Sequence, residues 1–329
     1  MMAKILITGG AGFIGYFLIK KLLEANNSDI TVIDNLSRGR VDTEFQQLLE
    51  HTNVRFINGD LTDPMLYTDL DRDYDYIYHL AGVIGVKHVM QNPDKVLYVN
   101  ALSTLNIFEY AKKAKSLKKL FFSSTSEVYS GTMKHFGITV PTDEDVPLTI
   151  ADIKADRTSY ALSKMYGESI GFIYGRKYGI PVTVGRYHNV YGPRMGFAHV
   201  IPEMFVKITK NDIIDVASPA HTRAFCFVDD AIVLTILATE SPDTINEIVN
   251  IGNSREEVSI KDLVLKIAEV LNKAITINEL PDTPGSPQRR CPDTTKIEKL
   301  TGYTPVFSLE EGIRRTYDWY KDKLNVRYE

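Results

Sequence analysis

Short apolar runs alternate with helical patterns through the first half of the chain. The runs have the length of buried strands and lie at residues 5–7, 30–33, 54–57, 76–80, 120–122 and 182–184. Between the runs at 76–80 and 120–122, apolar residues recur at nearly helical spacing, at Val99, Leu102, Leu105 and Phe108. This spacing predicts a helix over residues 96–113. The alternation predicts an α/β fold, a doubly wound parallel sheet with helices on both faces.

The pattern changes after about residue 185, where prolines at positions 193, 202 and 219 interrupt it. Beyond this point we expect a short strand at 223–228, a helix at 229–237 and a strand at 248–251. Amphipathic helices are expected at 260–271 and 309–320, and a long polar loop with several prolines at 281–292. We interpret this tail as a smaller C-terminal α/β lid over the mouth of the sheet.

Composition and charge exclude several classes of function. The 329 residues are 44% hydrophobic and carry a net charge of −4 without a basic run, so nothing suggests nucleic acid or an anionic membrane as a partner. No apolar stretch is long enough to span a bilayer, and the first strand begins too early to leave room for a signal peptide. Cys226 and Cys291 match neither a metal spacing nor a disulfide framework. We therefore expect no bound metal and a cytoplasmic location.

Glycines follow the first apolar run at the spacing of a dinucleotide-binding turn. Gly9, Gly12 and Gly15 allow a sharp turn, a close approach of the backbone to a pyrophosphate and close packing of the next helix. The start of that helix presents N–H groups and a positive dipole end to the phosphates. Asp34 follows nineteen residues after Gly15, where its carboxylate can bind the adenosine ribose hydroxyls. NAD is favoured over NADP, although Arg38 nearby is of a type that can hold the ribose phosphate of NADP.

In a doubly wound sheet, ligands bind beyond the carboxyl ends of the strands. The expected cofactor site therefore also includes residues at these ends and on the helix facing them: Phe13, Ile14, Asn35, Asp60, Leu61, Leu80, Ala81, Gly82 and Asn100. Residues 1–185 would form the NAD-binding Rossmann domain, with a returning segment near 223–251. Residues 186–329 would mainly form the substrate domain.

Tyr160 and Lys164 are four residues apart, which places them on one face of a helix, one turn apart. An ammonium group beside a phenol favours the phenolate, as does the positive charge of an oxidised nicotinamide. A phenol with an ordinary pKa of ~10 could then act as a base near neutrality. The serine- and threonine-rich strand end at 123–126 precedes this pair, and a hydroxyl there can hold a substrate hydroxyl against Tyr160.

With these motifs the chain resembles the extended short-chain dehydrogenase/reductases, the nucleotide-sugar epimerase/dehydratase family. The resemblance covers essentially the whole chain. It rests on T-G-G-x-G-x-I-G at 8–15, G-D at 59–60, S-S-T at 123–125, Y-x-x-x-K at 160–164 and N-V-Y-G-P at 189–193. It implies that Thr125 is the catalytic threonine, that Tyr160 is the base, and that Lys164 is its partner and also holds the nicotinamide ribose. It further implies a homodimer that pairs the helix at 96–113 with the helix after Tyr160.

The resemblance also implies a nucleotide-sugar substrate, with a UDP-sugar favoured. Asn189 and Arg223 would hold its diphosphate and nucleoside side, and Arg290 would meet the pyrophosphate or a sugar carboxylate. Tyr160 would take the proton of a sugar hydroxyl, usually at C4, while hydride passes to NAD. The resulting ketone acidifies the neighbouring C–H, or turns a C6 carboxylate into a β-keto acid.

Ser126 and Glu127 narrow the branch of the family, because plain 4-epimerases usually have small, uncharged residues there. GDP-mannose 4,6-dehydratase-like enzymes use the glutamate to take the C5 proton. UDP-glucuronate decarboxylase-like enzymes also carry T-S-E-V-Y, together with G-P-R-M, T-R-A-F and Q-x-R-x-P-D, which this chain has at 192–195, 222–225 and 288–293. These matches favour a UDP-glucuronate-type decarboxylase or epimerase. Residues 81–87 and 195–202 depart from that pattern, and 186–193 is also similar to GDP-mannose 3,5-epimerase-like sequences.

Several alternatives stay open on the sequence alone. A 4,6-dehydratase, a net 4-dehydrogenase that releases NADH and a non-catalytic dinucleotide sensor share most of these motifs. Glu127 could be a helix-start carboxylate without chemistry, and the segment at 129–156 could be a substrate loop or plain surface. Further candidates for substrate contact are Lys87, His88 and Arg194, of which the first two could equally lie in a solvated loop, while His199 and His221 are expected at structural or rim positions.

Overall fold

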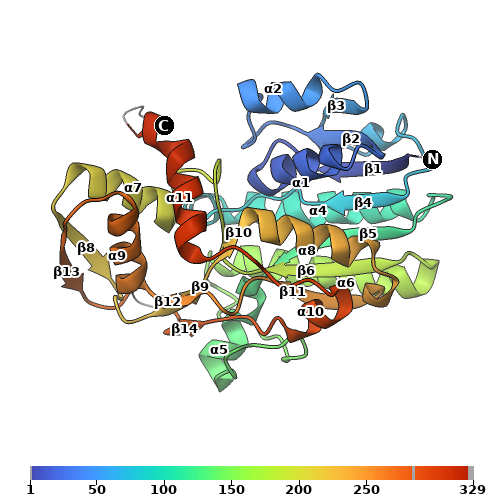
Figure 1. The fold of residues 1–329 in the computed structure, drawn as a ribbon. Coiled ribbons are helices and arrows are strands. Elements are labelled where there is room, and N and C mark those ends of the chain that lie inside the picture. Colours follow the sequence, from blue (N-terminus) through green and yellow to red (C-terminus); the bar gives the residue numbers. More distant parts are fainter. Residues whose placement is uncertain (1, 284–285, 325–329) are drawn as a thin grey trace.

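The computed structural model describes residues 2–283 and 286–324, and within them seven parallel strands form one central sheet. Its strand order is β11-β6-β5-β4-β1-β2-β3 (Figure 1). The strands are β1 (Ala3–Thr8), β2 (Ser28–Asp34), β3 (Val54–Asn58), β4 (Tyr76–His79), β5 (Lys119–Thr125), β6 (Val182–Tyr187) and β11 (Glu247–Ile251). Each predicted run of the first half is one of these strands, and the predicted doubly wound parallel sheet is confirmed.

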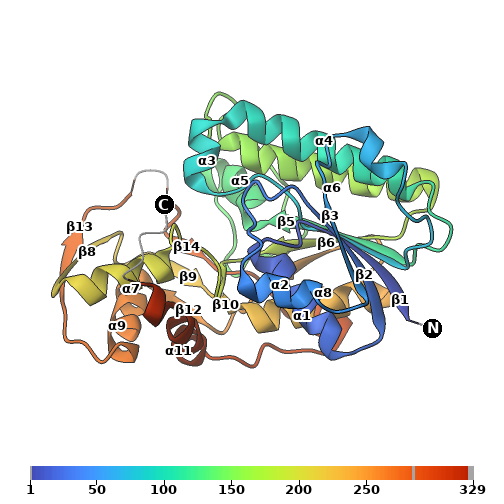
Figure 2. The ribbon, with the colours of Figure 1, turned by 90° about the horizontal axis from the view of Figure 1, so that it is seen from above.

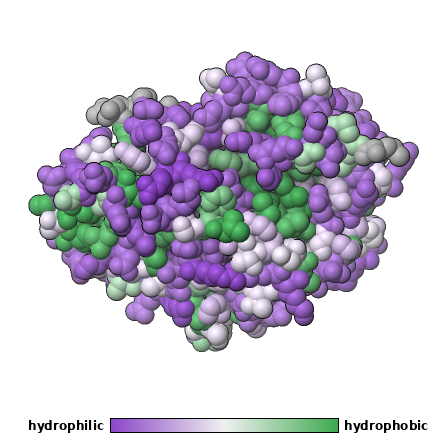
Figure 3. All heavy atoms as spheres, in the orientation of Figure 1, coloured by the Kyte–Doolittle hydropathy of each residue, from purple (hydrophilic) through white to green (hydrophobic). Residues whose placement is uncertain are grey.

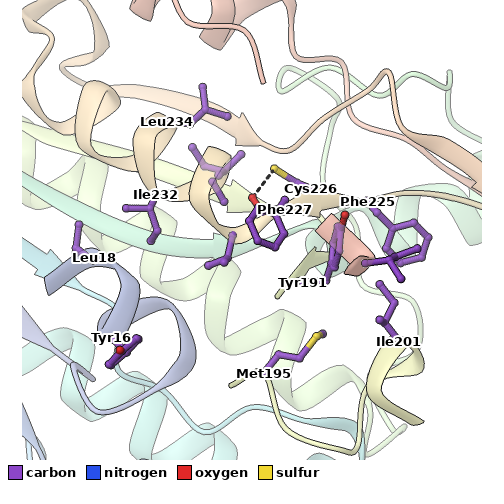
Figure 4. Packing of buried hydrophobic residues seen from close by; sticks show 14 of the residues in the cluster. Tyr16, Leu18, Tyr191, Met195, Ile201, Phe225, Cys226, Phe227, Ile232 and Leu234 are labelled. Carbon is purple, nitrogen blue, oxygen red and sulfur yellow. Dashed lines mark hydrogen bonds between the residues drawn. The ribbon is translucent and has the colours of Figure 1, made fainter. Parts of the chain in front are cut away.

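Helices cover both faces of the sheet, as Figure 2 shows from above. One face carries α4 (Pro93–Ala111) and α6 (Thr158–Tyr178), and the other carries α1 (Phe13–Glu24) and α8 (Val228–Glu240). Each face has its own hydrophobic core, because the strands are buried on both sides and contribute alternate side chains to each. The larger core continues through Tyr191, Phe225 and Phe227 into the C-terminal part of the chain (Figure 4).

The C-terminal part builds a lid beside the carboxyl ends of the strands (Figure 1). Its helices are α7 (Val200–Lys210), α9 (Ile260–Val270) and α11 (Leu309–Tyr320). Small sheets join β8 (Ile213–Ala217) to β13 (Thr276–Leu280), β7 (Val190–Tyr191) to β10 (Cys226–Phe227), and β9 (Thr222–Ala224) to both β12 (Glu257–Ser259) and β14 (Arg289–Arg290). The remaining helices of five residues or more are α2 (Thr43–Leu49), α3 (Val86–Gln91), α5 (Ser130–Phe136) and α10 (Thr295–Thr301) in the described part of the chain.

The structure refines three of the segments that the sequence describes. The segment at 281–292 contains β14, which pairs with β9 so that Arg290 lies opposite Arg223. A strand pairing as short as this one joins segments that are distant in the sequence, so it leaves no periodic pattern from which it could be predicted. The segment at 129–156 contains α5, and the predicted strand at 223–228 is divided into β9 and β10.

The chain returns from the lid to the central sheet with α8 and β11, and Asp230 on α8 anchors the segment before α11. Its buried carboxylate accepts hydrogen bonds from the Tyr303 hydroxyl at 2.7 Å and from the backbone N–H groups of Val306 and Phe307 at 3.0 Å each. These bonds fix the path of the chain into the lid, because a carboxylate buried in the core needs hydrogen-bond donors for its oxygens.

The surface of the face shown in Figure 3 is mostly hydrophilic, with hydrophobic side chains gathered in patches. Among the described residues, no helix combines the length and the apolar character that crossing a membrane requires.

Candidate active site

The turn after β1 leaves a cradle that no larger residue could line. Gly9 has φ +75°, and a Cβ there would lie 2.7 Å from the backbone nitrogen of Ala81. A Cβ on Gly15 would lie 2.4 Å from the Gly9 carbonyl oxygen, so helix α1 can approach the turn only through glycine. Gly12 is the N-cap of α1 and offers no side chain to the first N–H groups, which stay available to a phosphate; Phe13 and Ile14 follow in the first turn. The observed cradle fits the pyrophosphate of a dinucleotide.

Asp34 ends β2 beside this turn. Its carboxylate accepts hydrogen bonds from the backbone N–H groups of Ala11 at 3.0 Å and Leu36 at 2.8 Å, while burial raises its pKa. The carboxylate is thereby held at the glycine turn, where a ribose diol would meet it. Arg38 extends in another direction, because its Nη1 donates to the Ile84 carbonyl at 3.3 Å and its charge acts on the Tyr160 phenol.

The other predicted cofactor residues lie at neighbouring strand ends. Asp60 follows β3 and accepts from the backbone N–H and the hydroxyl of Thr62, so these bonds lower its pKa. Asn100 on α4 holds the loop after β4, because its Oδ1 accepts from the Val83 N–H at 2.6 Å and its Nδ2 donates to Ser163 of α6 at 3.1 Å. This set also contains Asn35, Leu61, Leu80, Ala81 and Gly82.

Thr125, Tyr160 and Lys164 meet where β5 ends and α6 begins. A hydrogen bond joins the Thr125 hydroxyl to Tyr160, and burial raises the pKa of the Tyr160 phenol to about 12. Lys164 is 4% exposed, donates to the Ser123 carbonyl at 2.8 Å and lies 6.0 Å from the centre of the Tyr160 ring. Burial lowers the pKa of Lys164 to about 8. Contrary to the expectation of a base near neutrality, burial keeps the Tyr160 phenol protonated there, so its role as a base depends on positive charge beside it.

Glu127 lies two residues beyond Thr125, in the 3₁₀ helix Ser126–Tyr129, and faces arginines from both parts of the chain. Arg290 of β14 contacts its Oε1 at 2.8 Å, and Arg157 at the start of α6 lies 3.7 Å from its Oε2. The charge of Arg290 is the main reason that the pKa of Glu127 is lowered, followed among the cations by Arg157 and Arg223. Ser126 beside it is 5% exposed. Glu127 is therefore an ionised carboxylate within a positive environment rather than a strong base.

A buried ion pair lies beneath this site, and the sequence reading missed it. Arg186 of β6 is 2% exposed and makes a bidentate contact with Glu168 of α6, at 2.9 Å and 2.7 Å. Arg186 also donates to the Tyr129 hydroxyl and the Glu144 carbonyl at 2.9 Å each, and Ser124 donates to Glu168. The available signal was a charged residue inside an apolar strand, which requires a partner because a buried charge is costly unpaired.

The remaining predicted substrate residues do not form one group. Asn189 has φ +38° and donates to the Ala224 carbonyl at 2.9 Å, which joins the end of β6 to β9. Arg194 lies over the Tyr16 ring and pairs with Asp42 and Glu44 at 2.7 Å and 2.9 Å. Its charge is matched there by two carboxylates, and a contact of Arg194 with the substrate stays a prediction.

The histidines and Lys87 take separate positions. His88 is exposed on α3, and the side chain of Lys87 lies outside the described residues. His199 precedes α7, where burial lowers its pKa to about 4. His221 is 4% exposed, and neither ring nitrogen has a hydrogen-bond partner among the described residues, although Asp282 lies 3.3 Å from Nε2.

A cavity of about 240 Å³ lies in the lid beside Arg223. Arg223 is half-buried and donates to the Thr222 carbonyl at 2.6 Å and the Ser286 hydroxyl at 2.9 Å. Burial lowers its pKa to about 10, and Arg290 contributes. Apolar and polar side chains share the lining, including Met204, Lys207, Ser218, His221 and Ile260. A mixed lining with a cation at one end suits a heterocyclic base attached to a phosphate.

Comparison with known proteins places this chain among enzymes of nucleotide sugars. The sequence profile of the family described as GDP-mannose 4,6 dehydratase matches residues 6–316. UDP-glucuronic acid decarboxylase 5 of Arabidopsis thaliana is 32% identical over 326 residues, which cover 98% of this chain and 91% of the relative.

Solved structures with the same fold include enzymes of different reactions. UDP-glucuronic acid 4-epimerase from Bacillus cereus, in complex with UDP-glucuronic acid and NAD, matches with a TM-score of 0.83 and 29% identity, covering 97% of this chain and 99% of that one. A dTDP-glucose 4,6-dehydratase from Streptomyces venezuelae, solved with NAD, matches with a TM-score of 0.83 and 26% identity, covering 97% of each chain. Decarboxylation, epimerisation and dehydration are thus all represented among the relatives.

Proposed function

Because this chain belongs to the GDP-mannose 4,6-dehydratase family, whose members are NAD-dependent enzymes that modify nucleotide sugars, we propose that it acts on a UDP-sugar with a C6 carboxylate. It oxidises C4 transiently and then decarboxylates or epimerises the sugar. The observation that carries this proposal is the position of Glu127 and its arginines beside Tyr160. Positive charge exceeds negative charge there, at the point where the sugar ring would meet the phenol.

The chain's own residues supply the binding and the proton transfer. The glycine turn and Asp34 would hold NAD, which when bound accepts hydride from C4 and later returns it. Thr125 holds the C4 hydroxyl, and Tyr160 removes its proton at the phenolic oxygen. Lys164 stabilises the phenolate by its charge while the Ser123 carbonyl fixes its position.

Oxidation at C4 makes a C6 carboxylate labile. The C5–C6 bond then breaks, carbon dioxide leaves, and the electron pair passes to C5 and the C4 oxygen. Hydrogen bonds from Tyr160 and Thr125 can stabilise the negative charge on that oxygen. This step needs no base at C5, so an ionised but weakly basic Glu127 does not impede it.

A 4,6-dehydratase is the second candidate, because the Streptomyces venezuelae dehydratase shares the fold and Glu127 is the residue expected to take the C5 proton in a dehydratase. The lowered pKa of Glu127 argues against this role, since a carboxylate paired with Arg290 is a poor proton acceptor.

The cavity beside Arg223 is the proposed site of the nucleoside. Arg223 lines this cavity and pairs in register with Arg290, and Asn189 donates a hydrogen bond to the carbonyl of the next residue, Ala224. A diphosphate bridging the two would meet guanidinium groups on one side. We favour uridine as the base because the uronate-processing relatives act on UDP-sugars.

Product mass is the test of this proposal. The pure protein is incubated with NAD and a panel of UDP-, GDP- and dTDP-sugars that includes UDP-glucuronate, with Tyr160→Phe as the matched control. We expect loss of carbon dioxide from UDP-glucuronate, or an unchanged mass with a new NMR spectrum, and at least ~100-fold slower turnover by the variant. Loss of water from another sugar would establish the dehydratase. Released NADH would indicate a net dehydrogenase, and turnover of no sugar would favour a dinucleotide sensor.

A homodimer is part of the same proposal. Helices α4 and α6 pack side by side and leave large apolar residues exposed, among them Leu97, Tyr98, Tyr166 and Ile173. Pairing these helices across a two-fold axis would bury this surface in a four-helix arrangement. Sedimentation as a monomer at micromolar concentration would refute the homodimer.

A cytoplasmic location is also proposed. Both cysteines are free, as a reducing compartment would keep them.

A further inference from the structure

The side chain of Asn250, a buried residue of β11, joins four separate segments of the chain. Its Oδ1 accepts hydrogen bonds from the Tyr129 hydroxyl at 3.0 Å and from Nε2 of His188 at 2.9 Å. Its Nδ2 donates to the carbonyl oxygens of Thr142 and Asp293 at 3.0 Å each. An amide has two donor and two acceptor positions, and all of them are used here. These partners are fixed relative to one another, because moving any of them would leave a buried polar atom unpaired.

The chemistry of the partners fixes the orientation of the Asn250 amide. Carbonyl oxygens can only accept hydrogen bonds, so those of Thr142 and Asp293 must face Nδ2. The Tyr129 hydroxyl accepts from Arg186 at 2.9 Å, which leaves its own hydrogen for Oδ1. An aspartate at position 250 would therefore place a carboxylate oxygen opposite two carbonyl oxygens, where no hydrogen bond can form.

The donor side of the amide holds the segment that carries Arg290. Strand β14 has two residues, and its pairing with β9 is limited to them. The next residues are held by Thr142, whose N–H donates to the Cys291 carbonyl at 2.9 Å and whose carbonyl accepts from the Asp293 N–H at 2.8 Å. Because Asn250 donates to both Thr142 and Asp293, it ties this short pairing to the central sheet.

The acceptor side of the amide holds the segment that carries Glu127. Tyr129, which donates to Asn250, lies two residues after Glu127 in the same 3₁₀ helix. Glu127 in turn contacts Arg290 at 2.8 Å. One amide thus fixes the chain on both sides of this ion pair, and a shift of either segment would move the guanidinium relative to the carboxylate.

We propose that Asn250 is a positioning residue, which holds Arg290 at the distance from Glu127 that binding of the nucleotide sugar requires. This inference rests on the proposed function, in which Arg290 meets the diphosphate or a carboxylate of the substrate. A guanidinium binds such a group through two parallel hydrogen bonds, so a displaced Arg290 keeps its charge but loses this geometry. The sequence gave no indication of this role, because the partners of Asn250 are distant along the chain.

A double-mutant cycle separates this role from a merely structural one. Calorimetric titration measures the dissociation constant of UDP-glucuronate for NAD-loaded Tyr160→Phe, the parent, which does not consume the ligand. Asn250→Asp, Arg290→Gln and both together are then added to the parent. We expect Asn250→Asp to weaken binding ~10- to 100-fold, the effect of a misplaced binding group. In the presence of Arg290→Gln it should weaken binding by less than about twofold further, because no guanidinium is left to be positioned.

Two control substitutions are made in the same parent. Asn253→Asp is the same change three residues along the chain, but the Asn253 oxygen accepts from the Arg255 N–H at 3.1 Å, a bond that aspartate keeps. Lys119→Met removes buried hydrogen bonds to Ala238 and Thr244 where β5 begins, at the end of the sheet opposite the site. Both should bind UDP-glucuronate within about twofold of the parent, the second even if its melting temperature falls.

Circular dichroism establishes that each variant is folded. If Asn250→Asp does not fold, Tyr129→Phe takes its place in the cycle, because it removes the hydroxyl that donates to Asn250 and keeps the ring. The same dependence on Arg290 is then expected.

The outcomes distinguish this inference from the proposed function, which product mass from the wild type decides. If the wild type converts UDP-glucuronate but Asn250→Asp binds it as tightly as the parent, the role of Asn250 is overturned and the proposed function stands. The same holds if the losses from Asn250→Asp and Arg290→Gln multiply, since Asn250 would then act independently of Arg290. Unchanged binding by Arg290→Gln also overturns the role, and a parent that binds no UDP-glucuronate overturns both.

Discussion

Replacing Glu168 by glutamine tests how the catalytic helix is held on the sheet. Glu168 is one turn beyond Lys164 on α6, and its carboxylate is the only counter-ion that contacts Arg186 among the described residues. Glutamine keeps the size of the side chain and one acceptor oxygen. It removes the negative charge and turns one of the two accepting atoms into a donor that faces the guanidinium.

The magnitude follows from the burial of the pair. Side-chain exposure is 2% for Arg186 and 6% for Glu168, so the guanidinium would remain uncompensated in the protein interior. Removing one partner of such a pair costs ~3–5 kcal/mol of unfolding free energy. With an unfolding entropy of about 2.1 cal/mol/K per residue, a chain of this length would lose ~4–7 °C in melting temperature.

Thermal and urea unfolding, followed by circular dichroism, measure this loss. Glu310→Gln is the matched control, because its partner Arg314 is 2.9 Å away but both side chains are more than half exposed. We expect the control to cost less than ~1 kcal/mol. A Glu168→Gln variant that loses no more than the control would refute the assignment of Glu168 and Arg186 as a stabilising pair. We also expect the variant to lose activity, because Ser124 and the helix bearing Tyr160 both depend on Glu168.

Two further predictions concern proton transfer and the lid. Burial lowers the pKa of Lys164 to about 8, and its ammonium form supports the Tyr160 phenolate. We therefore expect kcat/KM to fall as pH rises through about 8, measured in the NAD-loaded enzyme, and a rate that stays constant to about pH 10 would contradict this role. Asp230→Ala leaves the Tyr303 hydroxyl and the N–H groups of Val306 and Phe307 without their acceptor. This should lower the unfolding free energy by at least ~3 kcal/mol in urea titration, and a loss below ~1 kcal/mol would count against the anchoring contact.

The central sheet and the pair of Tyr160 and Lys164 could be predicted from the sequence, because each depends on residues that are close together in the chain. Buried strands of a parallel sheet are apolar on both faces, so they are recognisable as short continuous runs. The glycine turn and the Tyr160–Lys164 spacing each depend on backbone geometry within a few residues. The structure places these residues at one edge of the sheet, as parallel strands require.

The arginines were harder to interpret, because an arginine has the same sequence signature whether it binds a substrate, a structural carboxylate or a backbone carbonyl. Arg194 was predicted as a substrate contact, and the structure shows that it also joins α2 to the start of the lid through Asp42 and Glu44. Arg157 drew no attention, although it lies 3.7 Å from Glu127. In both cases the partner is distant in sequence, so no local pattern could reveal it.

The sequence by itself determined the parallel sheet, the dinucleotide turn and the positions of Thr125, Tyr160 and Lys164, because hydrophobic periodicity and backbone constraints act over short stretches of chain. The tertiary structure decided which charges meet. It brought Arg290 of β14 and Arg157 at the start of α6 to the same carboxylate, that of Glu127. It also paired Arg186 with Glu168. Charge acts through space rather than along the chain, so the electrostatics of this site, and with it the choice of sugar, depend on the folded arrangement.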